Sequence, residues 1–251
     1  MNQKKKRRKQ TRKPNAPQTK PFVHHLDELR SRFFLIVIVV LICSCIGYSF
    51  HQQLLQLLIK PLGQPVYYTT PGGGFDLIFK VSLLSGTLLA MPFIVYEFLA
   101  FLKPALPQIS LVKSFYIILF SCILMGLGVS TAYFFSLPAA LYFLNSFGTP
   151  DVKSLISSRD YLSFIMLYMG GFGFIFQLPL VLLLINSFQR LSVKRMFRYL
   201  RFVVLGSFIF AAILTPTPDL FNQTIMALPI IILYVASIGI IWGINTRRQK
   251  E

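Results

Sequence analysis

The stretch YLSFIMLYMGGFGFIFQLPLVLLLINSFQ, residues 161–189, contains no Asp, Glu, Lys or Arg. It is long enough to span a membrane, because an α-helix needs about 20 apolar residues to cross the hydrocarbon core. Further uncharged intervals lie on both sides of it, at residues 33–53, 81–96, 114–150, 202–218 and 220–246. Of the 251 residues 55% are hydrophobic and 13% are charged, and the mean hydropathy is +0.64. The chain is therefore predicted to be an all-α integral membrane protein.

These intervals predict six transmembrane helices, at about residues 33–52, 80–101, 114–137, 161–185, 202–214 and 223–244. The interval 114–150 is too long for one crossing and too short for two, so we expect an outer interfacial helix to start near Pro138. Only 13 residues separate Arg201 from Thr215. They would reach about 20 Å, so the fifth span is predicted to be short.

The distribution of basic residues predicts that both termini face the cytoplasm. With six spans, 21 of the 25 Lys and Arg residues fall on the side that holds the termini, and four fall on the other side. We expect a basic cytoplasmic tail at 1–20, one membrane domain at 21–246 and a short tail at 247–251. The net charge of +17 is concentrated near the N-terminus, which favours contact with anionic membrane lipids over binding of nucleic acid.

The sequence offers little for catalysis. It contains no phosphate-binding loop, no His-Glu-x-x-His motif and no Gly-x-Ser-x-Gly elbow. The three cysteines lie within apolar stretches and are interpreted as small buried hydrophobes rather than bridges or zinc ligands. We therefore expect no enzyme activity and no cofactor or metal, and any transport would draw energy from a gradient or from partner proteins.

Polar residues at membrane depth are expensive and are candidates for function. Gln177 lies in the middle of the fourth span, and Glu97 lies near the cytoplasmic end of the second. A structural hydrogen bond would also explain Gln177, and extension toward the interface would also explain Glu97. Pro92, Pro179 and Pro229 interrupt spans 2, 4 and 6, so bent helices could enclose a concavity.

The segment before the first span combines apolar and charged residues. Phe22, Leu26, Leu29 and Phe33 recur at helical spacing, which predicts a face that lies on the membrane. Glu28 stands four residues before Arg32, so an intrahelical ion pair is one interpretation. The other is a carboxylate acceptor for a basic peptide.

Several motifs, in order, resemble the TatC family, the multispanning core of the twin-arginine protein translocase. They are HLDELR at residues 25–30, FLKPAL at 101–106, YLSF at 161–164, FQLP at 176–179, LTPTPD at 214–219 followed by Gln223, and ALP at 227–229. The resemblance covers about residues 21–246. It implies a glove-shaped, concave bundle of six helices with short fifth and sixth spans.

The resemblance also implies a function. Members bind signal peptides with two consecutive arginines and pass folded proteins across the membrane, powered by the proton gradient, together with single-span TatA and TatB partners and further copies of themselves. The alternative interpretation is a secondary transporter of a small solute, which would predict internal repeats and ion-pairing residues near the bilayer midplane. The host would be a prokaryotic plasma membrane, or alternatively a thylakoid or mitochondrial inner membrane.

By resemblance, Glu28 and Arg30 match the signal-peptide contact before span 1, and Phe101 and Pro104 belong to the second part of that site. Gln177 matches a polar position that faces the concavity and partner helices, and Asp219 and Gln223 match the partner-docking loop into span 6. The second acidic contact is expected near Ser110, where residues 107–113 hold no carboxylate. Asp27 or Glu97 is therefore the hypothetical second charge.

Overall fold

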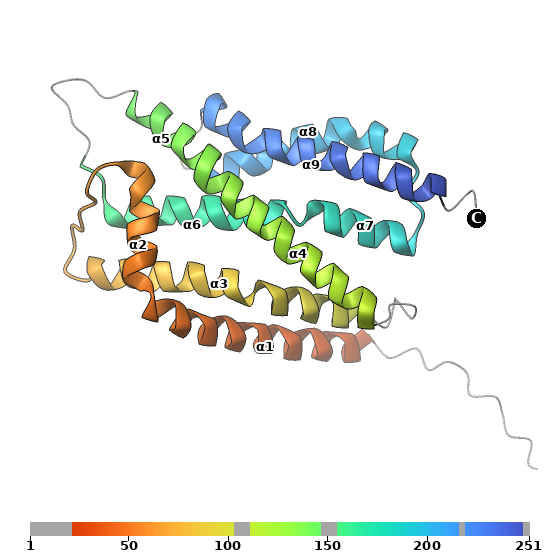
Figure 1. Ribbon diagram of the computed structural model, residues 1–251, viewed down its shortest axis with the longest axis horizontal. Helices are drawn as coiled ribbons and strands as arrows, with labels where there is room; N and C mark the ends of the chain where they lie inside the picture. The colour runs from red at the N-terminus through yellow and green to blue at the C-terminus, as the bar shows by residue number, and fades with distance from the viewer. Residues whose placement is uncertain (1–21, 103–110, 147–154, 216–218, 248–251) are drawn as a thin grey trace, which may run out of the picture.

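The computed structural model describes residues 22–102, 111–146, 155–215 and 219–247 (Figure 1). The chain forms helices α1 (Phe22–Ser49), α2 (His51–Ile59), η1 (Lys60–Leu62), α3 (Gly73–Leu102), α4 (Leu111–Thr131), η3 (Ala132–Ser136), α5 (Leu137–Asn145), α6 (Ser158–Ile175), α7 (Leu178–Phe188), α8 (Val193–Leu214) and α9 (Leu220–Arg247). Within the described ranges, six helical segments are long and apolar enough to cross a membrane. The predicted all-α, six-span fold is confirmed.

The first span differs from its predicted bounds. α1 is one continuous helix from Phe22, so the charged segment before the span and the span itself are not separate. It ends at Ser49, and the unpredicted helix α2 then turns across the other helices (Figure 1). Leu58 of α2 is buried, so α2 adds to the protein core. Absence of charge alone did not reveal this turn, because α2 is itself uncharged.

The third span continues without the predicted break at Pro138. α4 passes through the π-helical segment η3 directly into α5, and the whole runs to Asn145. Pro138 lies in the first turn of α5, directly after η3, where a local change of winding accommodates its missing N–H. Leu137, Ala140 and Leu141 are buried, so α5 packs into the protein rather than lying alone at the membrane surface.

The last two helices are longer than the predicted spans. α8 has 22 residues and includes Lys194, Arg195, Arg198 and Arg201, which the sequence placed in a loop. α9 has 28 residues. The predicted fifth span, residues 202–214, is the charge-free part of α8, and the predicted sixth span, residues 223–244, lies within α9. Charge marks where a helix leaves the hydrocarbon core and does not mark where it ends.

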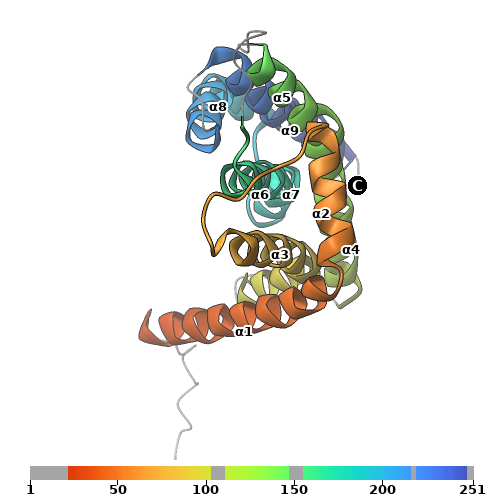
Figure 2. The ribbon, with the colours of Figure 1, turned by 90° about the vertical axis from the view of Figure 1, so that its left-hand side faces the viewer.

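The bundle is concave, as Figure 2 shows. α1 and α3 form one end, α8 and α9 form the other, and α4 with α5 forms the wall that joins them. α6 and α7 lie between the two ends. In the most apolar part of the fourth span, formed by α6 and α7, 56% of residues are buried, against none in the most apolar part of the first span, so the fourth span is the centre of the protein.

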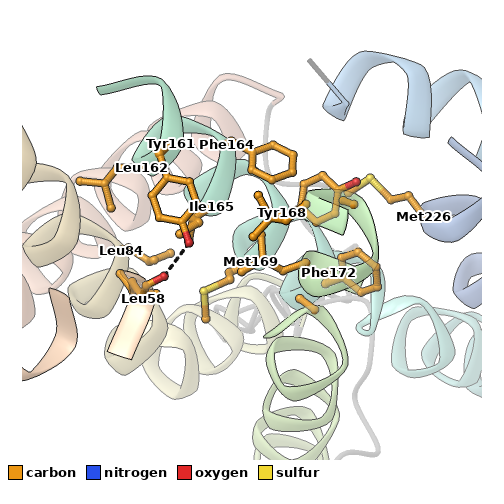
Figure 3. Close-up of a cluster of buried hydrophobic side chains, with 14 of the residues drawn as sticks. Leu58, Leu84, Tyr161, Leu162, Phe164, Ile165, Tyr168, Met169, Phe172 and Met226 are labelled. Carbon is orange, nitrogen blue, oxygen red and sulfur yellow. Dashed lines mark hydrogen bonds between the residues drawn. The ribbon is translucent and has the colours of Figure 1, made fainter. Parts of the chain in front are cut away.

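The core surrounds α6. Tyr168, Phe172 and Ile165 are fully buried there (Figure 3). The Tyr161 hydroxyl donates to the Leu58 carbonyl at 2.8 Å, which ties α6 to α2. The three cysteines are free thiols, and Cys45 lies exposed on α1, so the expectation that it is buried was wrong. Apolar side chains of a membrane protein face lipid as readily as the core.

The packing of α1 on α3 depends on glycines placed against serines. Gly86 of α3 faces Ser44 of α1, and Gly47 of α1 faces Ser85 of α3. A Cβ atom at Gly86 would lie 2.5 Å from the Ser44 Cα and backbone N. Backbone atoms cannot rotate away, so a side chain at Gly86 would push the two helices apart.

We expect Gly86→Ala to destabilise the protein by about 1–3 kcal/mol, the usual cost of overpacking. Thermal unfolding of the purified protein in detergent measures the loss. Gly126→Ala is the matched control, because nothing lies within 4 Å of a Cβ at Gly126 in α4. Equal melting temperatures for the two variants would contradict the close α1–α3 contact.

Candidate functional site

Two carboxylates contact one guanidinium in the N-terminal part of α1. Arg32 donates through Nη2 and Nε to Glu28 Oε1, at 2.8 and 3.2 Å, and through Nη1 to Glu97 Oε2 at 2.6 Å. The first contact joins successive turns of α1, which confirms the predicted i,i+4 pair. The second joins α1 to α3 across 65 residues of sequence. We call Glu28, Arg32 and Glu97 the acidic triad.

Glu97 is buried within the protein and paired with Arg32, and its predicted place near the membrane interface stays a prediction. Only 7% of its side chain is exposed, against 21% for Glu28 and 25% for Arg32. A carboxylate this buried needs a charged partner, because its desolvation is otherwise uncompensated. Arg32 supplies that partner, and a guanidinium suits the task because its N–H groups form a planar fork. The triad keeps one net negative charge.

The other residues predicted for this site lie around the triad. Asp27 and Arg30 are both exposed on α1, and the Arg30 guanidinium carbon lies 5.7 Å from the centre of the Phe34 ring. Phe101 is half-buried, one helical turn beyond Glu97 on α3. Pro104 and Ser110 lie outside the described residues. The structure thus brings together Glu28 and Glu97 but leaves Asp27 outside the ion pairs of the triad.

Gln177 lies at a break in the fourth span. α6 ends at Ile175 and α7 begins at Leu178, with Pro179 in its first turn. Proline has no backbone N–H and cannot continue the hydrogen bonding of α6, which explains the interruption. The Gln177 side chain is buried, accepts the Ser121 hydroxyl at 2.7 Å and donates to the Ser121 carbonyl at 3.2 Å.

Apolar hollows lie on two sides of Gln177. One, of about 510 Å³, is bordered by α3, α4, α6 and α7, and its lining includes Phe98, Leu99 and Met125. The other, of about 430 Å³, is bordered by α6, α7, α8 and α9, and its lining includes Gly206 and Ser207. Gln177 is the one polar residue common to both linings. Figure 2 shows α6 and α7 between the two ends of the bundle, which explains the two hollows.

We expect the Ser121–Gln177 pair to contribute about 1 kcal/mol of coupling energy, a usual value for a hydrogen bond between transmembrane helices. The measurement is a double-mutant cycle of Ser121→Ala and Gln177→Leu, with stability followed by chemical unfolding in detergent. Strictly additive effects would contradict the pair. The sequence did not reveal Ser121, because nothing in it relates residues 56 positions apart.

Asp219 and Gln223 stabilise the junction of α8 and α9. The Asp219 carboxylate accepts the Asn222 backbone N–H at 2.7 Å and the Asn222 amide at 3.0 Å, which caps the start of α9. The Gln223 amide donates to the Phe208 carbonyl of α8 at 3.0 Å. Both residues thus make local structural contacts, and their predicted contact with partner proteins stays a prediction.

Comparison with known proteins assigns the fold to a family. Residues 24–229, which include the triad and Gln177, match the family described as Sec-independent protein translocase protein (TatC). The chain belongs to the TatC family. The TatC protein of Synechocystis is 35% identical over 216 residues, which cover 86% of this chain and 85% of the relative. The chloroplast TATC protein of pea is 34% identical over 216 residues, which cover 84% of this chain and 61% of the pea protein.

A solved structure agrees with this assignment. The crystal structure of a twin-arginine translocase receptor TatC superimposes with a TM-score of 0.76 at 29% identity, covering 86% of this chain and 97% of that one. The resemblance inferred from the sequence motifs is confirmed, and so is the concave TatC fold.

Proposed function

We propose that this TatC-family chain is the signal-peptide receptor and scaffold of a twin-arginine translocase, which exports folded proteins across a membrane using the proton gradient. One observation carries the proposal: Glu28 and the buried Glu97 already hold a guanidinium group between them. Carboxylates bind guanidinium through short, charge-assisted hydrogen bonds, so the triad has the chemistry to recognise arginine. Glu97 is our candidate for the second acidic contact.

An apolar hollow lies next to the triad on α3. Phe98 and Leu99, the residues after Glu97, line the hollow that extends to Gln177. A signal peptide could therefore place its arginines at the triad and its apolar stretch along α3. The hollows on either side of Gln177 are our candidate contacts for single-span TatA- and TatB-like partners.

The test is export of a folded fluorescent reporter into sealed vesicles that contain this chain and its single-span partners. A leader with Arg-Arg should direct export, and the same leader with Lys-Lys should not. Equal export of both would refute the receptor role. Uptake of labelled solutes by vesicles with this chain alone would instead support the secondary-transporter alternative.

We propose that both termini face the cytoplasm of a prokaryotic cell, with the membrane of a plastid or mitochondrion as the alternative host. In inverted vesicles, a cysteine at exposed Arg198 of α8 should react with an impermeant maleimide, and one at exposed Asp160 of α6 should not. All three native cysteines would first be replaced by alanine. The reverse pattern of labelling would contradict the orientation.

A further inference from the structure

The place where a leader arginine would bind is already filled by a residue of this chain. Arg32 occupies the position between Glu28 and Glu97, with three of its N–H donors directed at the two carboxylates. Only 7% of the Glu97 side chain is exposed, and its Oε2 already accepts from Arg32 at 2.6 Å, so an incoming guanidinium at this atom would compete with Arg32.

We propose that Arg32 is an internal competitor for the guanidinium site. It holds the two carboxylates in the empty receptor and is displaced when a leader arginine binds. This inference rests on the proposed receptor function and adds a mechanism of regulation to it. A receptor without such an occupant would leave Glu97 buried and unpaired whenever no cargo is bound.

The surroundings of Arg32 permit the exchange. Its side chain is 25% exposed, so it can leave toward solvent without crossing the core. One of its two ion pairs lies within α1 and the other joins α1 to α3, so Arg32 can release Glu97 and Glu28 in two separate steps. The exchange replaces one arginine–carboxylate pair by another of the same chemistry. The gain in binding therefore comes from the rest of the leader.

Competition makes a quantitative prediction that a positioning role does not. If Arg32 blocks the site for part of the time, the apparent Kd of every leader is raised by the same factor, the inverse of the unblocked fraction. Removal of Arg32 should then tighten binding of Arg-Arg and Lys-Lys leaders equally and leave the preference between them unchanged. If Arg32 instead positioned Glu28, its removal would weaken Arg-Arg binding.

The experiment measures the Kd of fluorescent leader peptides for the full chain in lipid nanodiscs. For Arg32→Gln we expect Arg-Arg binding to tighten by about fivefold to tenfold, the range that follows if Arg32 blocks the site for about 80–90% of the time. Arg32→Lys should give an intermediate value, because an ammonium cannot match two carboxylates as a planar fork does. Arg198→Gln, which removes an exposed arginine of α8, is the charge control and should change the Kd less than twofold.

Weaker or unchanged Arg-Arg binding in Arg32→Gln would overturn the competition. If Arg32→Gln fails to fold, the Kd of Arg32→Lys serves as the test, and weaker or unchanged Arg-Arg binding in that variant would likewise overturn the competition. The receptor function itself is tested by the unmodified chain: if this chain bound Arg-Arg and Lys-Lys leaders equally, the proposed function and the competition would both fall. A clear preference in the unmodified chain, with no tightening in the variants, would overturn the competition alone.

Discussion

Replacement of Glu28 by glutamine is expected to weaken binding of a twin-arginine leader by about 10-fold to 100-fold, and replacement by lysine should abolish binding. Loss of one partner from a partly buried, charge-assisted pair costs about 1.5–3 kcal/mol, and each 1.4 kcal/mol is a factor of ten in Kd. Lysine would add repulsion to this loss. The Kd of the leader in nanodiscs tests the glutamine variant, and export of a twin-arginine reporter tests the lysine variant.

The control for Glu28 is Asp160→Asn, which removes an exposed carboxylate at the start of α6. This variant should bind the leader like the unmodified chain. Along the long axis of the molecule, α6 starts on the side opposite to the start of α1, which carries Glu28 and Arg32 (Figure 1). Normal export of the twin-arginine reporter by Glu28→Lys would show that the role assigned to Glu28 is wrong.

Glu97→Gln is expected to weaken leader binding by about tenfold or more, whereas Asp27→Asn should have little effect. Both residues were candidates for the second charge, and the structure separates them. Glu97 contacts the same guanidinium as Glu28, at 2.6 Å, while Asp27 is exposed and lies outside the triad. An exposed charge contributes little to a specific contact, because water and salt screen it.

The same peptide titration distinguishes the two candidates, with melting temperatures as a check on folding. Unchanged binding in the double variant Asp27→Asn, Glu97→Gln would exclude both residues as the second contact. A stronger effect of Asp27→Asn than of Glu97→Gln would place the second charge at the surface of α1 and would reject our assignment of Glu97.

The predicted bounds failed where neighbouring helices decide the local structure. α4 continues through η3 into α5, although Pro138 predicted a break there. Leu137 and Ala140 are buried against the rest of the protein, and this packing stabilises the helical path. α8 starts nine residues before its charge-free part, since arginines can remain helical outside the hydrocarbon core. In contrast, Pro179 did interrupt its span, directly after Gln177.

The residue pattern alone was enough to predict a membrane protein, its six spans and its family, because span length and apolar composition are local properties and the motifs are short. It also gave the Glu28–Arg32 pair as one of two interpretations, because the two residues lie on successive turns of one helix. Only the tertiary structure joined Arg32 to Glu97 and Ser121 to Gln177, over 65 and 56 residues. Those contacts depend on how α1 packs on α3 and how α4 meets the break before α7, and a single chain's residue pattern does not specify which distant polar groups will meet.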